Sequence, residues 1–177
     1  LVAMSRLPMG ARLTVWFRVP TLEAEIEAAG VVRWATDDAV GLQGDRQVVQ
    51  GLEQRAAGGE GAAAWALSSY YGVILHDAAR AQAWLDRATD LQDPEAERYS
   101  AHLIRMGQPF SRYGVSAPAA VDRLLTDACR SNGHACYDLA AAHESGYFGP
   151  IDLAVARTYY GLGAEQGDRM SWEALAR

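Results

Sequence analysis

The side chains best suited to metal or thiol chemistry are few in this sequence and stand far apart. Cys129 and Cys136 are the only cysteines, and a structural zinc site would need two further ligands at short spacing. His143-Glu144 lacks the second histidine of a metalloprotease helix. The remaining histidines are His76, His102 and His134, and none has the spacing of a metal ligand. We therefore expect no metal site.

Motifs of hydrolases and nucleotide enzymes are also missing from the sequence. It holds no Gly-x-Ser-x-Gly turn for a serine nucleophile and no glycine loop for phosphate. The adjacent carboxylates of Asp37 and Asp38 fall in an expected turn, where Asp is favoured for backbone reasons. The sequence therefore predicts no catalytic residue, no cofactor and no enzymatic activity.

Composition indicates a globular chain whose partner is not nucleic acid. With 177 residues, 50% of them hydrophobic, the chain can bury a core. Its formal net charge is -6, and phosphate binding needs clustered positive charge. The apolar runs are too short for a membrane span and no signal peptide is visible, so we expect no membrane contact and a cytoplasmic location. Every basic residue is Arg, which together with abundant Ala and Gly indicates a GC-rich, bacterial genome.

The first 57 residues predict a short antiparallel sheet and a helix. Apolar and polar side chains alternate here with the period of a strand, and Gly30 is expected at a bulge. A helix is the competing interpretation for residues 22–29, because Glu and Ala favour helices. The glycines of residues 57–61 mark a linker. Strands are expected at residues 11–19, 22–34 and 39–43, and the helix at 45–56.

The pattern beyond residue 61 changes to that of helices in pairs. Four leucines, Leu67, Leu103, Leu139 and Leu175, lie 36 residues apart, and such a period indicates stacked helical hairpins. Gly72 and the loop over residues 107–116 interrupt the helical pattern. The three expected pairs cover residues 62–71 with 77–89, 94–106 with 117–129, and 134–144 with 151–164, and a fourth begins at residue 168.

The most regular unit carries a family resemblance. Its pattern of Leu139, Gly146, Gly149, Asp152, Ala156, Tyr159-Tyr160, Ala164 and Gly167 resembles the Sel-one-like repeat (SLR), a relative of the tetratricopeptide repeat. The spacing Asp77-x3-Ala81-x2-Trp84 in the first unit matches Asp152-x3-Ala156-x2-Tyr159 in the third. The resemblance covers about residues 61–177. It implies an α-solenoid with a concave groove that binds a protein or peptide partner.

The same resemblance bears on the two cysteines. In cysteine-rich members of the family, a pair similar to Cys129 and Cys136 forms a disulfide between adjacent helices. Here six residues separate the two, whereas seven are usual in that family, and a reducing cytoplasm would keep thiols free. Two small buried thiols are therefore the alternative.

A second resemblance concerns the N-terminal part. Residues 7–15, 30–34 and 40–42 resemble the later strands of a PilZ domain, a small β-barrel that binds cyclic di-GMP. The Arg-x3-Arg and (Asp/Asn)-x-Ser-x2-Gly motifs of that family have no match here, so this chain is not expected to bind cyclic di-GMP. The implied fold class is α+β, mostly α, with a truncated PilZ-like barrel over residues 1–57 and the α-solenoid over 58–177. The implied alternative function is a cyclic di-GMP effector in an intact parent protein.

The leucine period also predicts which residues face a partner. If Leu67, Leu103 and Leu139 point into the core, residues two and five positions away trace another face of the same helices. The alternative is a solvated face with Trp65 packed on the N-terminal sheet. The predicted partner-binding groove consists of Trp65, Arg98, Arg105, His134, Tyr137 and Glu144.

Overall fold

The computed structural model of the chain divides into two units, residues 1–58 and 59–177. It describes residues 12–18, 25–35, 40–44, 46–108 and 116–177. The first unit contains strands β1 (Arg12–Arg18), β2 (Glu25–Ala35) and β3 (Val40–Gly44), followed by helix α1 (Arg46–Ala57). The strands pair antiparallel in the order β1-β2-β3.

The expected fold class, α+β with a partial PilZ-like barrel, is wrong. A barrel closes by pairing its outer strands, and among the described strands β1 and β3 each pair only with β2. From residue 61 onward every regular element that the structure describes is a helix, so this part of the fold is a helical solenoid. Short alternating segments misled the prediction, because a period of two residues indicates a strand but says nothing about closure.

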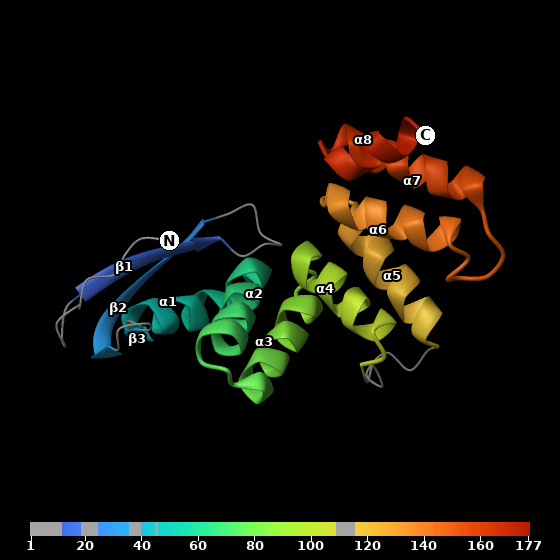
Figure 1. Ribbon diagram of the computed structural model, residues 1–177. Helices are drawn as coiled ribbons and strands as arrows, with labels where there is room; N and C mark the ends of the chain where they lie inside the picture. Colours follow the sequence, from blue (N-terminus) through green and yellow to red (C-terminus); the bar gives the residue numbers. More distant parts are fainter. Residues whose placement is uncertain (1–11, 19–24, 36–39, 45, 109–115) are drawn as a thin grey trace. The chain divides into compact units, whose positions relative to one another are not determined.

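The second unit consists of helical hairpins stacked in sequence order (Figure 1). Repeat 1 pairs α2 (Gly61–Ser69), which continues into a π-helical turn η1 (Tyr70–Ile74), with α3 (Ala78–Asp90). Repeat 2 pairs α4 (Pro94–Arg105) with α5 (Ala117–Cys129). Repeat 3 pairs α6 (Gly133–Glu144) with α7 (Leu153–Glu165), and the terminal helix is α8 (Arg169–Leu175). The described helices of this unit thus form three hairpins followed by a terminal helix, as in an α-solenoid.

Side-chain caps fix where most of these helices begin. Each capping side chain accepts a hydrogen bond from the backbone N–H three residues later, which would otherwise lack a partner. Pro94 and Pro118 occupy first-turn positions, where the missing proline N–H costs nothing. The caps are Asp77 on α3, Asp93 on α4, Asn132 on α6, Asp152 on α7 and Asp168 on α8.

The first helices of the hairpins line the inner side of the curve from α4 onward. Helix α4 contacts α6, and α6 contacts α8, whereas the second helices α3, α5 and α7 make no comparable contact with one another. Helices on the inside of a curved stack approach more closely than those on the outside. We call the surface formed by α2, α4, α6 and α8 the inner face.

Positions counted from the capping residues align the repeats differently from the 36-residue leucine period. Leu67 and Leu139 are the seventh residues after the caps Glu60 and Asn132, and both are fully buried. In repeat 2 the seventh residue after Asp93 is Ser100, while Leu103 is the tenth and only partly buried. Successive caps of the first helices lie 33, 39 and 36 residues apart, so repeat 2 begins three residues early. The expectation that Leu103 is a core residue equivalent to Leu67 is therefore wrong.

Candidate functional site

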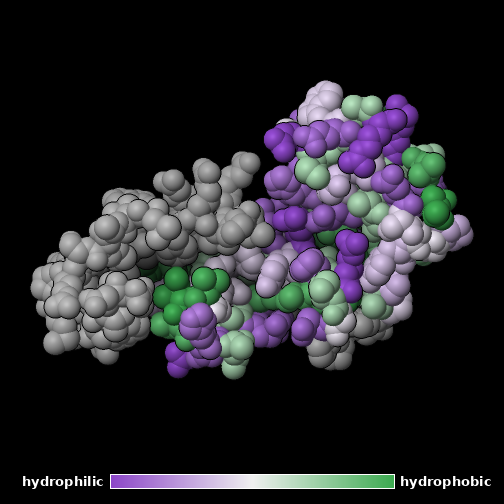
Figure 2. Space-filling view, in the orientation of Figure 1, coloured by the Kyte–Doolittle hydropathy of each residue, from purple (hydrophilic) through white to green (hydrophobic). Residues whose placement is uncertain are grey.

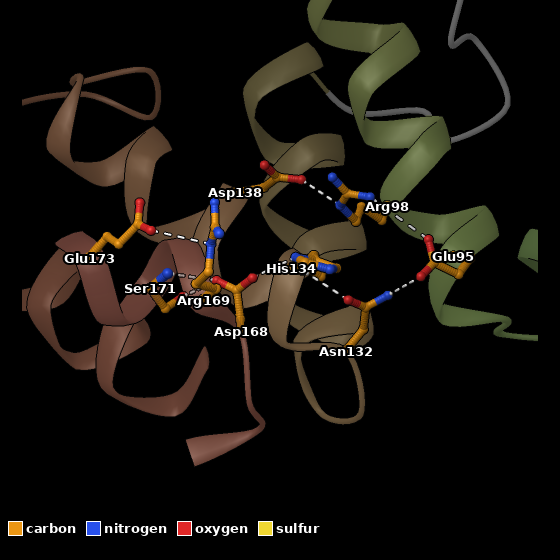
Figure 3. A network of polar contacts seen from close by, with 10 residues as sticks. Glu95, Arg98, Asn132, His134, Asp138, Asp168, Arg169, Ser171 and Glu173 are labelled. Atoms are coloured by element: carbon orange, nitrogen blue, oxygen red, sulfur yellow. Dashed lines mark hydrogen bonds and ion pairs between the residues drawn. The ribbon is translucent and has the colours of Figure 1, made fainter. Parts of the chain in front are cut away.

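A network of charged side chains joins the first helices of repeats 2 and 3 on the inner face (Figure 3). The Nε of Arg98 on α4 donates to Oδ2 of Asp138 on α6 at 2.7 Å, and Glu95 lies 3.8 Å from the same guanidinium. The side chains of Arg98 and Asp138 are about three-quarters buried, at 25% and 26% exposed. Arg98 therefore holds α4 and α6 together.

A second set of contacts links each first helix to the cap of the next. Nδ2 of Asn132 donates to Oε1 of Glu95 at 2.9 Å, while Oδ1 of Asn132 caps α6. Nδ1 of His134 lies 2.5 Å from Oδ1 of Asp168, an ion pair when the imidazole is protonated. In both pairs, the residue two positions after one capping residue contacts the capping residue of the next first helix. Figure 2 shows hydrophilic side chains gathered over this C-terminal part of the solenoid.

Burial in this network changes the pKa of Glu95. Burial raises this pKa above its ordinary value, and the neighbouring Arg98 and the hydrogen bond from Asn132 partly offset the rise. Glu95 therefore depends on its partners in the network to remain ionised.

The cluster of Ser171, Asp168 and His134 contains the residue types of a hydrolase triad in a different order. Oδ2 of Asp168 accepts hydrogen bonds from the backbone N–H and the Oγ of Ser171, at 2.7 and 2.6 Å. The carboxylate stands between the hydroxyl and the imidazole, so the imidazole is not placed to take the proton of Ser171. Ser171 is also fully buried. The cluster caps α8 and supplies no nucleophile.

Aromatic side chains make the equivalent contacts between repeats 1 and 2. The ring of Trp65 on α2 lies 5.4 Å from the ring of Tyr99 on α4, and the ring of His102 stacks with that of Tyr99 at 6.4 Å. Trp65 is only 6% exposed, whereas Tyr99 is 39% exposed. Tyr99 therefore presents an aromatic surface that Trp65 supports from beneath.

The far ends of α4 and α6 carry a third group of contacts. The guanidinium of Arg105 lies over the ring of Tyr147 at 5.4 Å. The hydroxyl of Tyr160 donates to Oε2 of Glu144 at 2.5 Å, and its ring lies 5.5 Å from that of Tyr137. Burial and the adjacent Glu144 raise the pKa of Tyr160, so the phenol stays neutral and keeps donating.

The six residues predicted for a groove all lie on first helices, and each contacts a neighbouring part of the fold. Their role in partner binding stays a prediction. Tyr99, His102 and Asp138 also make contacts on these helices and were missed. Counting from the cap Asp93 instead of Leu103 finds His102, the ninth residue after the cap, as Ser69 is in repeat 1. Tyr99 and Asp138, each the sixth residue after its cap, lie outside the predicted positions.

Cys129 and Cys136 form a disulfide, with Cα atoms 4.6 Å apart. The bond joins the end of α5 to the first turns of α6, and so connects repeat 2 to repeat 3. Both cysteines are buried within the core cluster around Leu125 and Leu139. Nε2 of Gln166, at the end of α7, donates to the carbonyl oxygen of Cys129 at 2.8 Å, so repeat 3 also contacts the disulfide through its second helix.

Two other kinds of site are absent from the described residues. No group of three or more potential metal ligands is found there. In the same part of the chain, no helix combines the length and apolarity of a transmembrane segment.

Known proteins resemble this chain in structure, whereas comparisons of the sequence give no match. No protein-family model matches the sequence, and no curated protein matches it. A Sel1 repeat protein from Oxalobacter formigenes is similar over 72% of this chain and 96% of its own, with 23% identity and a TM-score of 0.61. A protective antigen of uropathogenic Escherichia coli strains, described as displaying an SLR fold, is similar over 70% of this chain, with 25% identity and a TM-score of 0.57. That match spans only 26% of the antigen. Residues 59–177 therefore have the fold of Sel1 repeat proteins, and these two matches give no support to a PilZ-like domain.

Proposed function

We propose that the chain is a non-enzymatic scaffold that binds a protein or peptide along the inner face of its first helices. The observation that carries this proposal is the row of polar and aromatic side chains that reach solvent there and are held in place by neighbouring side chains. Side chains that are already ordered lose less entropy when a partner binds. Tyr and Arg are also among the residues that most often dominate binding energy. The row consists of Tyr99, His102, Arg105, His134 and Glu144.

The fold supports this proposal independently of the individual residues. Stacked hairpins create an extended inner surface, and solenoid proteins use such surfaces for binding. Both similar structures come from bacteria, in agreement with the bacterial origin predicted from composition. A role in bacterial signalling stays a prediction. The cyclic di-GMP alternative has lost its basis, because the described strands form no PilZ-like barrel.

The test compares two triple variants in partner capture. The inner-face variant combines Tyr99→Ala, His102→Ala and Arg105→Ala, all on α4. The matched control combines Gln82→Ala, Arg87→Ala and Arg157→Ala, which are exposed on the second helices α3 and α7. Proteins captured from the source organism are identified, and the purified partner is then titrated by calorimetry.

We expect the inner-face variant to weaken binding more than tenfold and the control to leave it unchanged. Thermal unfolding of both variants serves as the check that each is folded. Equal affinity of the wild-type protein and the inner-face variant would contradict the proposal.

The disulfide bears on where such a scaffold works. Disulfides persist in oxidising compartments and are rare in the cytoplasm. Cys129–Cys136 therefore favours an oxidising compartment over the predicted cytoplasmic location. Alkylation of protein taken directly from cells tests this, since two modified thiols would restore the cytoplasmic prediction.

A further inference from the structure

The interior of repeat 2 is polar at positions where repeats 1 and 3 are apolar. In the first helices, the fourth residue after the cap is small and apolar in repeats 1 and 3 but acidic in repeat 2. These residues are Ala64, Glu97 and Cys136. The seventh residue follows the same pattern, as Leu67, Ser100 and Leu139. Repeat 2 thus breaks the apolar pattern at two successive core positions.

The second helix of repeat 2 adds two charged groups near Glu97. They are Arg123, which is exposed, and Asp127, which is partly buried, and both act electrostatically on Glu97. The buried side chains of α5 are themselves apolar, so the polar exception in the interior lies on α4. When local choices conflict with the pattern of the fold, the conflict often marks a function.

Glu97 is the buried member of this group. It is 4% exposed, and the cost of removing its charged form from water raises the pKa of its carboxyl to about 7. The nearby carboxylates of Asp127 and Asp93 raise this pKa further, while Arg123 and Arg130 lower it. Burial also raises the pKa of Asp93, so negative charge is disfavoured throughout this end of the hairpin.

Several polar groups on the elements packed against α4 bind one another. Arg130 is 73% exposed and pairs with Asp127 at 3.1 Å. On the side of α3, Thr89 and Ser100 exchange a hydrogen bond between hydroxyls at 3.0 Å. On the side of α6, Asn132 and Asp138 bind Glu95 and Arg98, as described above.

We propose that Glu97 makes repeat 2 a protonation-sensitive joint of the solenoid, in which the α4–α5 hairpin is firm while the carboxyl is neutral and loosens when it ionises. The ionised form would bring a charge into an interior that already faces two carboxylates. The sign follows from linkage: an acid that holds its proton more tightly in the folded state stabilises the fold at low pH. This contribution is complete below about pH 4.5 and is lost as pH rises through about 7.

The joint would regulate the inner face, a consequence that rests on the proposed function. Helix α4 carries Glu95 and Arg98, which connect repeat 2 to α6. Loosening of α4 would therefore disturb the contacts that order the inner face. Repeat 3, with Cys136 in place of Glu97, has no such group and would remain firm.

Hydrogen exchange measured by mass spectrometry between pH 5 and 8 tests the joint on the full chain without any partner. Protection factors, corrected for the intrinsic pH dependence of exchange, are compared for peptides of α4–α5 and of α6–α7. We expect protection of α4–α5 to fall by up to about tenfold per pH unit until about pH 7, and protection of α6–α7 to stay level. Glu97→Gln should remove most of this fall in the protection of α4–α5. The control Glu165→Gln, at an exposed site at the end of α7, should behave as the wild-type protein.

Two results would overturn the proposal. One is the same pH dependence in both hairpins of the wild-type protein, which needs no variant to observe. The other is a Glu97→Gln variant that retains the wild-type loss of protection. Because no partner is present, these results are independent of whether the inner face binds one.

Discussion

Repeats 2 and 3 share one fold but differ in what fills their interiors. Repeat 3 buries Leu139 completely and places Cys136 in a disulfide. Repeat 2 has Ser100 at the position of Leu139, with its hydroxyl bonded to Thr89, and Glu97 at the position of Cys136. Both repeats keep the caps and the small residues between helices. The geometry of a hairpin therefore depends on the caps at the helix ends and on the small residues that let its two helices approach closely. Its stability depends on the side chains buried between the two helices.

The largest expected effect comes from truncating the buried leucine in the interior of repeat 3. Leu139→Ala should lower the free energy of unfolding by about 3–4 kcal/mol, because a fully buried leucine leaves a cavity. Leu103→Ala, at a partly buried site, should cost about 1–2 kcal/mol. Urea denaturation measures both. Equal losses would mean that the register of repeat 2 follows the 36-residue period after all.

Removal of the disulfide should have the next largest effect. The double substitution Cys129→Ala and Cys136→Ala opens a short covalent loop, and loop closure of that size is worth about 2.5 kcal/mol through the unfolded state. Repeats 2 and 3 would then unfold less cooperatively. The single variants control for the loss of each side chain, and reduction of the wild-type protein should reproduce the shift. An unchanged denaturation midpoint after reduction would count against the bond.

A glycine at the helix contact of repeat 3 gives a third test. A Cβ on Gly163 would lie 3.0 Å from the backbone oxygen of Gly133 and would also meet the side chain of Ser171. Gly163→Ala should therefore cost about 1–3 kcal/mol through overpacking. Gly161, on the same helix, has open space around it, so Gly161→Ala should stabilise the protein by about 0.4–1 kcal/mol. Thermal unfolding of the pair tests the sign of each change.

The smallest expected effect concerns the ion pair that joins the two repeats. A double-mutant cycle with Arg98→Met and Asp138→Asn should give a coupling energy of about 0.5–1 kcal/mol, because both side chains retain contact with water. The coupling should weaken in 1 M salt. A value near zero in low salt would show that packing alone sets the angle between repeats 2 and 3.

Most of the helices could be predicted, for reasons that are local. Asp93-Pro94 predicted the start of α4, and the small residues after Asp77 and Asp152 predicted the second helices of repeats 1 and 3. Caps and prolines act within one turn, so the sequence alone shows them. The three-residue shift of repeat 2 was missed, because the leucine at position 103 happened to fit a regular period.

The candidate site was harder to predict than the helices. The binding face was predicted on the first helices and stays a prediction, and which of its residues are exposed depends on contacts between repeats. Trp65 is covered by Tyr99, and Arg98 is engaged by Asp138, both more than thirty positions later in the sequence. Helical periodicity gives the face of a helix but not the neighbour that covers it.

The caps also have a consequence for how such an array can change. The side chains of Asp93, Asn132 and Asp168 each cap the first helix of their own repeat. The position at which a repeat begins therefore does not depend on the length of the repeat before it. Residues can be gained or lost in a connection without rotating the helices downstream. Repeat 2 already shows this, since the three residues missing before it are restored after it. The array is therefore modular, and single hairpins could be exchanged at the caps while the others keep their register.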